Sequence, residues 1–335
     1  LLRLADKERT ASACLDAVRR GHAGSEADRS FARTLDPAAI EKDIDACGAR
    51  VVIFDGPEYP AGLDALKDPP AILFVRGRDL REIDPAVAVV GARNCSALGE
   101  ELARDMGRTL AREGCWVVSG AARGIDSASH EGALEHRRTA AVLGCGIDVT
   151  YPLAKRSLLG RIAAAGALVS EYPPGVPAEP FRFPARNRLV AGLARALVVV
   201  EGAAGSGSLI TADHALEIGR TVFAVPGVVT NPLTQAPHEL IREGATLIRG
   251  VGDLLHDLGL PDVGAERIRA GHVHGLTDAE RVALSSVRGS VLPDAVARAL
   301  DLPLPEAISV LMTLEMKGLV RNVGGRIERR PVALR

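Results

Sequence analysis

The sequence predicts an α/β protein whose sheet is largely parallel and is covered by helices on both faces. Short apolar runs, rich in β-branched residues, alternate with helical patterns from residue 87 to residue 225. The runs show no alternation of polar and apolar residues, which is typical of strands buried on both faces. Strands that alternate with helices along a chain indicate a parallel sheet with crossover helices.

The individual elements follow from the same patterns. A helix is expected over 100–112, where Leu102, Met106 and Leu110 recur at a spacing of four, and another over 212–218. Segments rich in proline and glycine separate the first strands. The expected strands cover residues 51–54, 71–75, 87–90, 115–118, 139–143, 167–169, 196–200, 221–225 and 246–248.

Three modules are expected along the chain. Residues 1–50 carry short helical patterns, residues 51–260 carry the α/β pattern with a tail and linker over 250–270, and residues 271–335 form a third module. Three helices and a hairpin in this last module are typical of a winged helix, and Gly324-Gly325 supplies the positive φ of a tight hairpin. Its helices are expected over 278–287, 292–300 and 305–317, and its strands over 319–323 and 326–329.

Charge and composition limit the possible classes of protein. The chain has 41 Lys and Arg against 42 Asp and Glu, so only a local cluster could attract a polyanion. Two segments, 181–195 and 317–335, are rich in arginine, although such segments are often only solvated basic faces. No apolar run is long enough to cross a bilayer, and the five cysteines form no C-x-x-C pair. A cytoplasmic protein with free thiols, no bound metal and no membrane contact is expected.

Three glycine-containing loops follow predicted strands, where the carboxyl ends of a parallel sheet form a ligand site. Glycines let the backbone approach a ligand, and a helix expected to begin near Leu209, capped by Ser208, offers free N–H groups to an anion. Phosphate is the ligand that suits such loops, although glycines after strands can also serve only to turn the chain. The loops are 91–94, with Gly91 and Arg93; 119–126, with Ser119, Gly120, Arg123 and Gly124; and 201–208, with Ser206, Gly207 and Ser208.

A predicted loop over 181–188 combines aromatic and basic residues. Phe181 and Phe183 flank Arg182 in a chain that is only 3% aromatic. Single-stranded nucleic acids bind through phosphate neutralisation and stacking of bases on aromatic rings, so Phe183 or Phe181 could stack a base. Alternatively, both rings anchor the loop on the core, and Arg186 and Arg188 pair with Glu201 or Glu171.

Signals of an enzyme are weak. The chain has no G-x-S-x-G, H-E-x-x-H or Walker motif, and the turn at 91–96 departs from the G-x-G-x-x-G of dinucleotide sites. Asp126 and His130 lie four residues apart on an expected helix, where they could form an acid/base pair or only brace the helix.

Six segments together resemble the DNA-processing protein A family, also called Smf. They are Val89-Val90-Gly91-Ala92-Arg93, Val118 to Asp126, Ser170-Glu171-Tyr172-Pro173-Pro174-Gly175, Phe183-Pro184-Ala185-Arg186-Asn187-Arg188, Ser206 to Ala212, and Phe223-Ala224-Val225-Pro226-Gly227. The resemblance implies an extended Rossmann-like domain that binds single-stranded DNA in a basic pocket, forms a homodimer and loads the RecA recombinase in natural transformation. It implies neither a cofactor nor a catalysed reaction.

Carried onto this chain, the resemblance implies two groups of site residues. Residues that contact DNA would be Arg93, Arg123, Arg182, Phe183, Arg186, Asn187, Arg188, Ser206, Gly207, Ser208 and Thr211. Residues of the phosphate-cradling loops would be Gly91, Ser119, Gly120 and Gly124. The dimer would use residues around 240–248, the first module would be similar to a sterile-alpha-motif domain, and the last to a winged helix.

Two positions depart from the family pattern, and two other functions remain open. Ala92 stands where the family usually has Ser or Thr, and Arg182 stands where it usually has His. One alternative is an enzyme of the lysine-decarboxylase-like group that hydrolyses nucleoside monophosphates, although its P-G-G-x-G-T-x-x-E signature is missing. The other is a regulator that binds duplex DNA through the winged helix.

Overall fold

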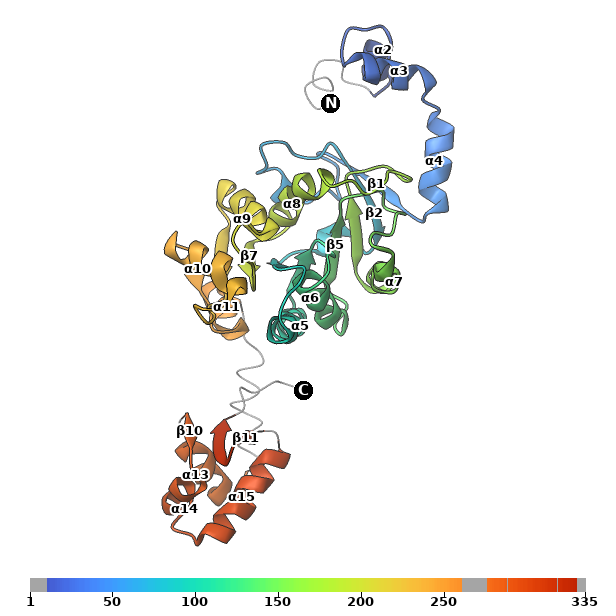
Figure 1. Cartoon of the computed structure of the whole chain (residues 1–335). Coiled ribbons are helices and arrows are strands. Elements are labelled where there is room, and N and C mark those ends of the chain that lie inside the picture. The colour runs from blue at the N-terminus through green and yellow to red at the C-terminus, as the bar shows by residue number, and fades with distance from the viewer. Residues whose placement is uncertain (1–10, 261–275, 288, 318, 330–335) are drawn as a thin grey trace. The chain divides into compact units, whose positions relative to one another are not determined.

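The computed structural model describes residues 11–260, 276–287, 289–317 and 319–329 of the chain. The chain divides into two compact units, residues 1–251 and 252–335, and element labels follow Figure 1. Among the described residues, no helix is both long and apolar enough to pass through a bilayer. The predicted division into three modules stays a prediction.

The first unit is built on a sheet of nine strands, in the order β1-β2-β6-β5-β4-β3-β7-β8-β9. The pairs β1–β2 and β2–β6 are antiparallel, and all other pairs are parallel, which confirms the predicted α/β class. The strands are β1 (Arg50–Ile53), β2 (Ile72–Gly77), β3 (Ala86–Val90), β4 (Trp116–Ser119), β5 (Thr139–Leu143), β6 (Ala167–Ser170), β7 (Ala196–Val199), β8 (Thr221–Ala224) and β9 (Thr246–Leu247).

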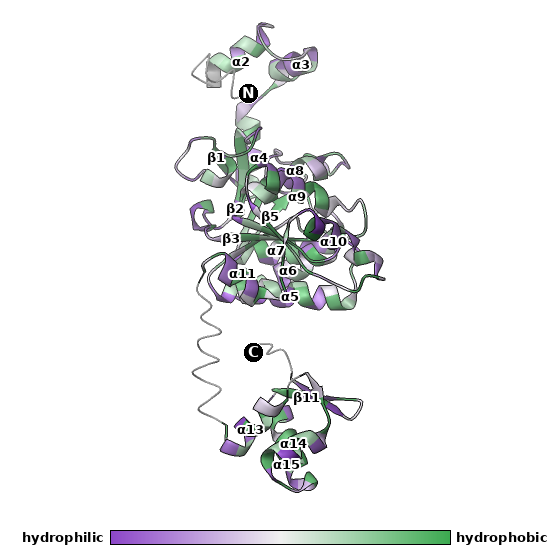
Figure 2. Ribbon diagram, turned by 90° about the vertical axis from the view of Figure 1, so that its left-hand side faces the viewer, coloured by the Kyte–Doolittle hydropathy of each residue, from purple (hydrophilic) through white to green (hydrophobic). Residues whose placement is uncertain are grey.

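Helices cover the two faces of the sheet in separate groups (Figure 1). On one face Leu158 and Ile162 of α7 pack with Leu143 and Leu168, and on the other Leu189 of α8 joins the large cluster of strand residues. Figure 2 shows the sheet as mainly hydrophobic, as expected for strands covered on both sides. The helices are α5 (Ala97–Arg112), α6 (Ile125–Leu134), α7 (Arg156–Ala165), α8 (Arg182–Gly192), α9 (Gly207–Glu217) and α10 (Gln235–Arg242).

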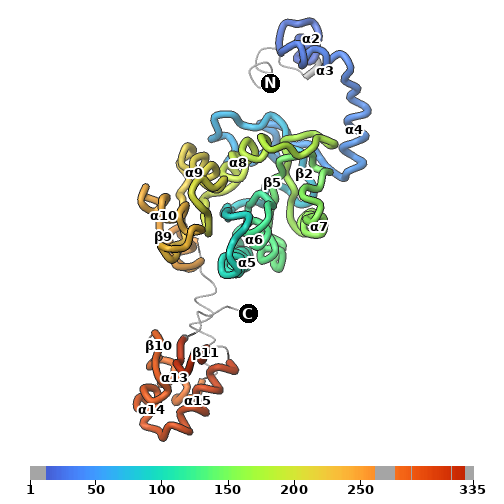
Figure 3. Tube along the Cα trace, in the orientation of Figure 1, coloured from blue at the N-terminus to red at the C-terminus, as the bar shows by residue number. Residues whose placement is uncertain are grey.

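The direction in which the chain adds strands to the sheet reverses once. From β3 the chain winds through α5, α6 and α7 to β6, then returns through α8 to β7 on the other side of β3. Helices α8 and α9 consequently run side by side (Figure 3). The carboxyl ends of β3 and β7 lie at the reversal, which is the place where open parallel sheets bind ligands.

The N-terminal segment forms the short helices α2 (Ala11–Arg19), α3 (Glu26–Thr34) and α4 (Pro37–Ala46). Ser25 and Asp28 form a capping box at the start of α3, and Asp36 caps α4 ahead of Pro37. Ile44 of α4 packs against the cluster of the α7 face.

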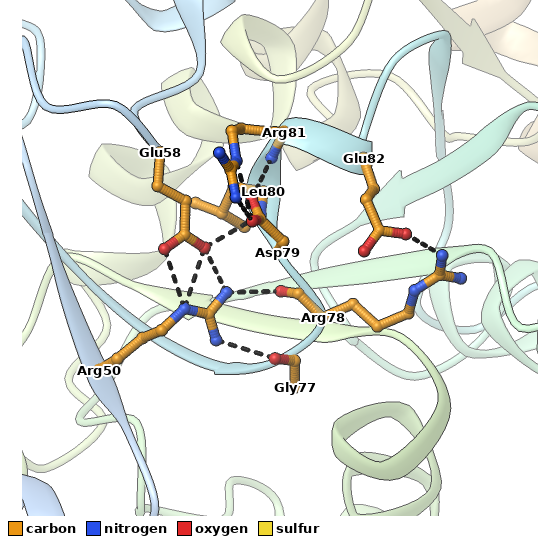
Figure 4. A network of polar contacts seen from close by, with 8 residues as sticks. All are labelled: Arg50, Glu58, Gly77, Arg78, Asp79, Leu80, Arg81 and Glu82. Carbon is orange, nitrogen blue, oxygen red and sulfur yellow. Dashed lines mark hydrogen bonds and ion pairs between the residues drawn. The ribbon is translucent and has the colours of Figure 1, made fainter.

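A polar network fastens β1 to the segment that follows β2 (Figure 4). Arg50 donates through Nε to both carboxylate oxygens of Glu58, at 2.9 and 3.0 Å, and through Nη1 to the carbonyl of Gly77 at 2.8 Å. The same Glu58 accepts the backbone N–H of Leu80 at 3.2 Å. One carboxylate therefore holds three segments at this edge of the sheet.

Described residues of the second unit contain the predicted helices and hairpin. They are α11 (Val251–Asp257), α13 (Asp278–Ser286), β10 (Ser290–Val291), α14 (Pro293–Leu300), α15 (Leu304–Met316), β11 (Val320–Val323) and β12 (Arg326–Arg329). Gly324 and Gly325 take positive φ in the hairpin, as predicted. The tail and linker expected over 250–270 contains a helix at 251–257, which the sequence analysis did not predict, and residues 261–270 lie outside the described part. Part of the basic segment 317–335 also lies outside it.

Candidate nucleic-acid interface

A pocket of about 310 Å³ lies at the carboxyl ends of β3, β4 and β7. It brings together two of the predicted loops, the first turn of α9 and one side of α8, although these segments are far apart in the sequence. The lining residues are Val90, Gly91, Arg93, Gly120, Ala122, Asp126, Phe183, Pro184, Arg186, Asn187, Val190, Ser206, Gly207, Ser208, Ile210 and Thr211. Its position is the one that the strand topology favours for a ligand.

Arg186 is the buried cation of the pocket. Its guanidinium lies against Gly120, where an added Cβ would come within 1.9 Å of Nη1, so any side chain at this position would displace the guanidinium. The residue is only 4% exposed, and its Nε has no hydrogen-bond partner in the described structure. Burial lowers the pKa of Arg186, and the nearby Arg93 lowers it further, while Asp126 opposes both. Arginine nevertheless keeps its charge in proteins.

Asp126 organises the loop after β4. Its Oδ2 accepts the backbone N–H groups of Gly120 at 3.1 Å and of Ala122 at 3.3 Å. Burial raises the pKa of this carboxyl, whereas Arg186 and the two N–H donors lower it. These contacts give Asp126 a structural role in the loop, and it also lines the pocket, a position that sequence reasoning did not assign to it.

The helix α9 points its N-terminus at the pocket. Ser206 is the N-cap residue, with its Oγ 2.9 Å from Oγ of Ser208, so the predicted start near Leu209 with Ser208 as the cap is wrong by two residues. Asn187 of α8 donates to the carbonyl of Gly207 at 3.3 Å. The first turn of α9 therefore presents hydroxyls and N–H groups beside Arg186.

The N-terminus of α5, which also lies at this edge, is already occupied by a carboxylate. Glu201, directly after β7, accepts the N–H of Ser96 at 2.9 Å and its hydroxyl at 2.6 Å. Ser96 is the N-cap of α5, and Gly99 in its first turn packs on the same carboxylate. The predicted alternative that Glu201 pairs with an arginine is therefore wrong. An anionic ligand would find the N-terminus of α5 filled.

Residues 182–188 form the start of α8, so the prediction of a loop there is wrong. Phe183 is half-buried and lines the pocket, with the guanidinium carbon of Arg93 5.7 Å from its ring centroid. Phe181 is 66% exposed and lies outside the pocket lining. Of the two rings, only Phe183 can face a ligand in the pocket.

Several predicted site residues are used elsewhere. Arg188 donates to both oxygens of Glu171, at 2.9 and 2.7 Å, which agrees with the structural alternative. Arg182 pairs with Glu179 at 3.4 Å and lies over Tyr172. Three further predicted site residues, Arg123, Ser119 and Gly124, also lie outside the pocket lining. Arg123 is exposed, and Ser119 donates its hydroxyl to the carbonyl of Val89 at 2.7 Å. Gly124 has a φ of +75° and packs against the Ala92 carbonyl.

His130 does not reach the pocket either. Its Nδ1 lies 2.6 Å from Oγ1 of Thr139 in the interior, and burial lowers its pKa to about 3. The imidazole is thus neutral near pH 7, and His130 and Asp126 each bond a different partner inside the fold. Of the predicted basic residues, Arg93 and Arg186 line the pocket. The other predicted residues that line it include Gly91, Gly120, Ser206, Gly207, Ser208 and Thr211.

Comparison with known proteins gives the family. The model of the family described as "DNA recombination-mediator protein A" matches residues 50–259, which include every strand of the large sheet. The chain belongs to this family. The resemblance that the six sequence segments indicated is therefore confirmed. The relatives described below are named for DNA processing.

Relatives and solved structures extend the match. A putative DNA processing protein DprA of Mycobacterium tuberculosis is 39% identical over 93% of this chain and 85% of its own length. The DNA processing protein DprA of Streptococcus pneumoniae is 41% identical over 66% of this chain and 78% of its own length. An X-ray structure of that pneumococcal protein has a TM-score of 0.66 and 38% identity, covering 72% of this chain and 85% of the other.

A second structure concerns the single-stranded DNA binding mode of DNA processing protein A from Helicobacter pylori. It has a TM-score of 0.58 and 28% identity, and it covers 63% of this chain and 97% of the other. The extended Rossmann-like fold predicted from the sequence is therefore shared with structures of this family.

Proposed function

We propose that this protein binds single-stranded DNA in the pocket between β3, β7 and α9 and acts by binding, without a catalysed reaction. Phosphate groups would lie on Arg186, Arg93 and the first turn of α9, and one base would stack near Phe183. Ser206 and Thr211 add hydroxyl donors to the same wall. Arginines, helix N-terminal amides and an aromatic ring are the groups that bind unpaired strands.

The observation that carries this proposal is the state of Arg186. A buried guanidinium nitrogen without an acceptor is costly, because burial removes the water that would otherwise bind it. The Nε itself is closed to solvent, so a phosphate in the pocket would bond the nitrogens at the end of the guanidinium, in charge-assisted bonds. Glycine at position 120 keeps the space that the guanidinium needs.

Membership of the family supports a proposal for the biological role. The Helicobacter relative binds single-stranded DNA. By the same resemblance we propose that this protein loads the RecA recombinase onto incoming DNA in the cytoplasm, during natural transformation and recombination. We also carry over a homodimer through the α/β unit, with contacts around α10 and β9.

Duplex DNA is a less suitable ligand. In a winged helix the third helix reads the major groove, and contacts with phosphate and guanine depend on Arg and Lys. The corresponding helix, α15, has the sequence LPEAISVLMTLEM, with two glutamates and no basic residue. A competition assay with duplex and oligo-dT, repeated after deletion of residues 270–335, separates the two ligands.

The test is a salt titration of oligo-dT binding by the full chain. Arg93→Ala combined with Arg186→Ala is expected to weaken binding about 100-fold, because two charge-assisted contacts are lost. The slope of log affinity against log salt should fall by about 0.7 for each lost phosphate contact. Fluorescence anisotropy with labelled dT15 measures both quantities.

Arg195→Ala is the matched control. This arginine lies in the same basic segment but pairs with Asp84, with both contacts at 2.6 Å, outside the pocket lining. It should leave affinity and slope almost unchanged. If the double variant melts normally and binds dT15 as tightly as the parent, the pocket is not the binding site. Release of free base from AMP by the parent would instead favour the hydrolase.

A further inference from the structure

Aromatic residues gather beside the pocket. The chain has one Trp, three Tyr and six Phe, and four of them, Tyr151, Tyr172, Phe181 and Phe183, lie in the segment before α7, in the segment after β6 and at the start of α8. Phe183 belongs to the pocket, but Tyr151 does not line it. The role proposed above therefore leaves Tyr151 without a function.

Tyr151 is an exposed ring that continues the pocket wall. Its ring centroid lies 5.5 Å from that of Phe183, with 31° between the planes. It is 54% exposed, so it contributes less to the core than a buried aromatic would. Arg93 stands over Phe183 at 5.7 Å. Phe183 thus has Arg93 over its ring and, as an aromatic neighbour, a tyrosine that is open to solvent.

The charges that follow Tyr151 suit a phosphate backbone. From residue 149 to residue 170 the chain carries Lys155, Arg156 and Arg161 and no acidic residue. Arg156 and Arg161 are exposed on α7, whose first turn also has no acid. The nearest preceding acid, Asp148, accepts the N–H of Gly175 at 2.8 Å.

The pocket volume requires a path of this kind. A space of about 310 Å³ is at the low end for small-ligand sites and holds about one nucleotide. A longer strand must leave the pocket, and an exposed ring beside a cationic surface is a platform on which the next base can stack.

We propose that Tyr151 is a second stacking position, which takes the base adjacent to the one held at Phe183 and directs the strand toward the start of α7. This inference rests on the proposed binding of single-stranded DNA. The ring makes the contact, and the hydroxyl is not needed for it.

The experiment compares Tyr151→Ala, Tyr151→Phe and Leu153→Ala in the full chain, by anisotropy with labelled dT15 over a range of salt. Leu153 is the matched control, since it is 71% exposed and lies two residues from Tyr151 but has no ring. Tyr151→Ala should weaken binding about tenfold without changing the salt slope, because a stacked base is lost and no phosphate contact. Tyr151→Phe and Leu153→Ala should bind within about twofold of the parent.

Three results would overturn the inference. Tyr151→Ala could bind dT15 as tightly as the parent, or Leu153→Ala could lose as much affinity, which would indicate a general effect on the loop. Tyr151→Phe could lose as much as Tyr151→Ala, which would assign the contact to the hydroxyl. In each of these cases the parent still binds dT15, so the proposed function stands. A parent that does not bind dT15 overturns both proposals.

Discussion

The helices α5 and α9 begin at the same edge of the sheet, directly after the neighbouring strands β3 and β7, yet their N-termini are used in opposite ways. Each has a serine as N-cap, Ser96 in α5 and Ser206 in α9. Glu201 hydrogen-bonds Ser96, whereas in the described part of the chain no carboxylate bonds the first turn of α9. One N-terminus is closed by the protein itself, and the other lines the pocket.

This difference shows how a fold with several helix N-termini at one edge can select one of them. Every N-terminus offers N–H donors and a partial positive charge, so position alone does not distinguish them. At α5 an internal carboxylate accepts the N–H and the hydroxyl of the N-cap Ser96 and would repel a phosphate there. The N-terminus of α9 keeps its charge for an external anion, and Arg186 adds to it.

Among changes at these two helix ends, a carboxylate placed at the N-terminus of α9 should produce the largest effect. Ser206→Asp places a carboxylate at the N-cap, where Asp caps as well as Ser, so the fold should keep its stability. A charge about 4 Å from a phosphate should weaken dT15 binding about 50-fold at low salt, and less at high salt. Anisotropy at two salt concentrations measures the loss.

Ser206→Asn separates charge from shape in that experiment. Asn also caps helices well and is neutral, so it should bind dT15 within a few-fold of the parent. Equal loss in both variants would mean that shape rather than charge governs this position. No loss in either would show that α9 does not contact the strand.

Removing the carboxylate from the N-terminus of α5 should lower the stability of the fold more than it lowers the affinity for dT15. Glu201→Gln replaces one of two acceptors by a donor, so either the N–H or the hydroxyl of Ser96 loses its partner, at a cost of about 2 kcal/mol. Denaturant unfolding measures this change, and dT15 affinity should stay close to that of the parent.

Glu100→Gln is the matched control for α5. Glu100 lies in the first turn of the same helix and pairs with Arg104 at the surface, so its loss should cost no more than about 0.5 kcal/mol. Equal stability of both variants would remove the distinction between the two helix ends. Tighter dT15 binding by Glu201→Gln would reveal a second anion site at α5.

The network at β1 offers a comparison with a carboxylate that lies away from both helix ends. Glu58→Gln weakens the contacts that hold Arg50 and Leu80 but stands outside the pocket lining. Because the side chain of Glu58 is 22% exposed, water compensates part of the loss, and about 1 kcal/mol of stability is expected to disappear. Unfolding in denaturant should show this decrease, and dT15 binding should be unchanged. If Glu58→Gln lost as much stability as Glu201→Gln, the carboxylate at α5 would contribute no more than an ordinary partly buried carboxylate.

Prediction from sequence succeeded where local pattern decides the structure. Strands over 86–90, 139–143 and 221–224 are continuous runs of apolar or small residues, which only a sheet covered on both faces would bury. It failed over 182–188, because aromatic and charged residues without an apolar stripe resemble a loop. That segment is helical since Leu189 and Val190 in its last turns anchor it to the core.

The sequence by itself determined the α/β order, the strand positions and the family, because periodicity and short motifs are local properties of the chain. Only the tertiary structure decided which charges remain available to a ligand. Arg188 is held by Glu171, 17 residues away, and Ser96 by Glu201, 105 residues away, while Arg186 lines the pocket. Such pairings join segments distant in the chain, so the availability of a charge depends on packing rather than on the motif that contains it.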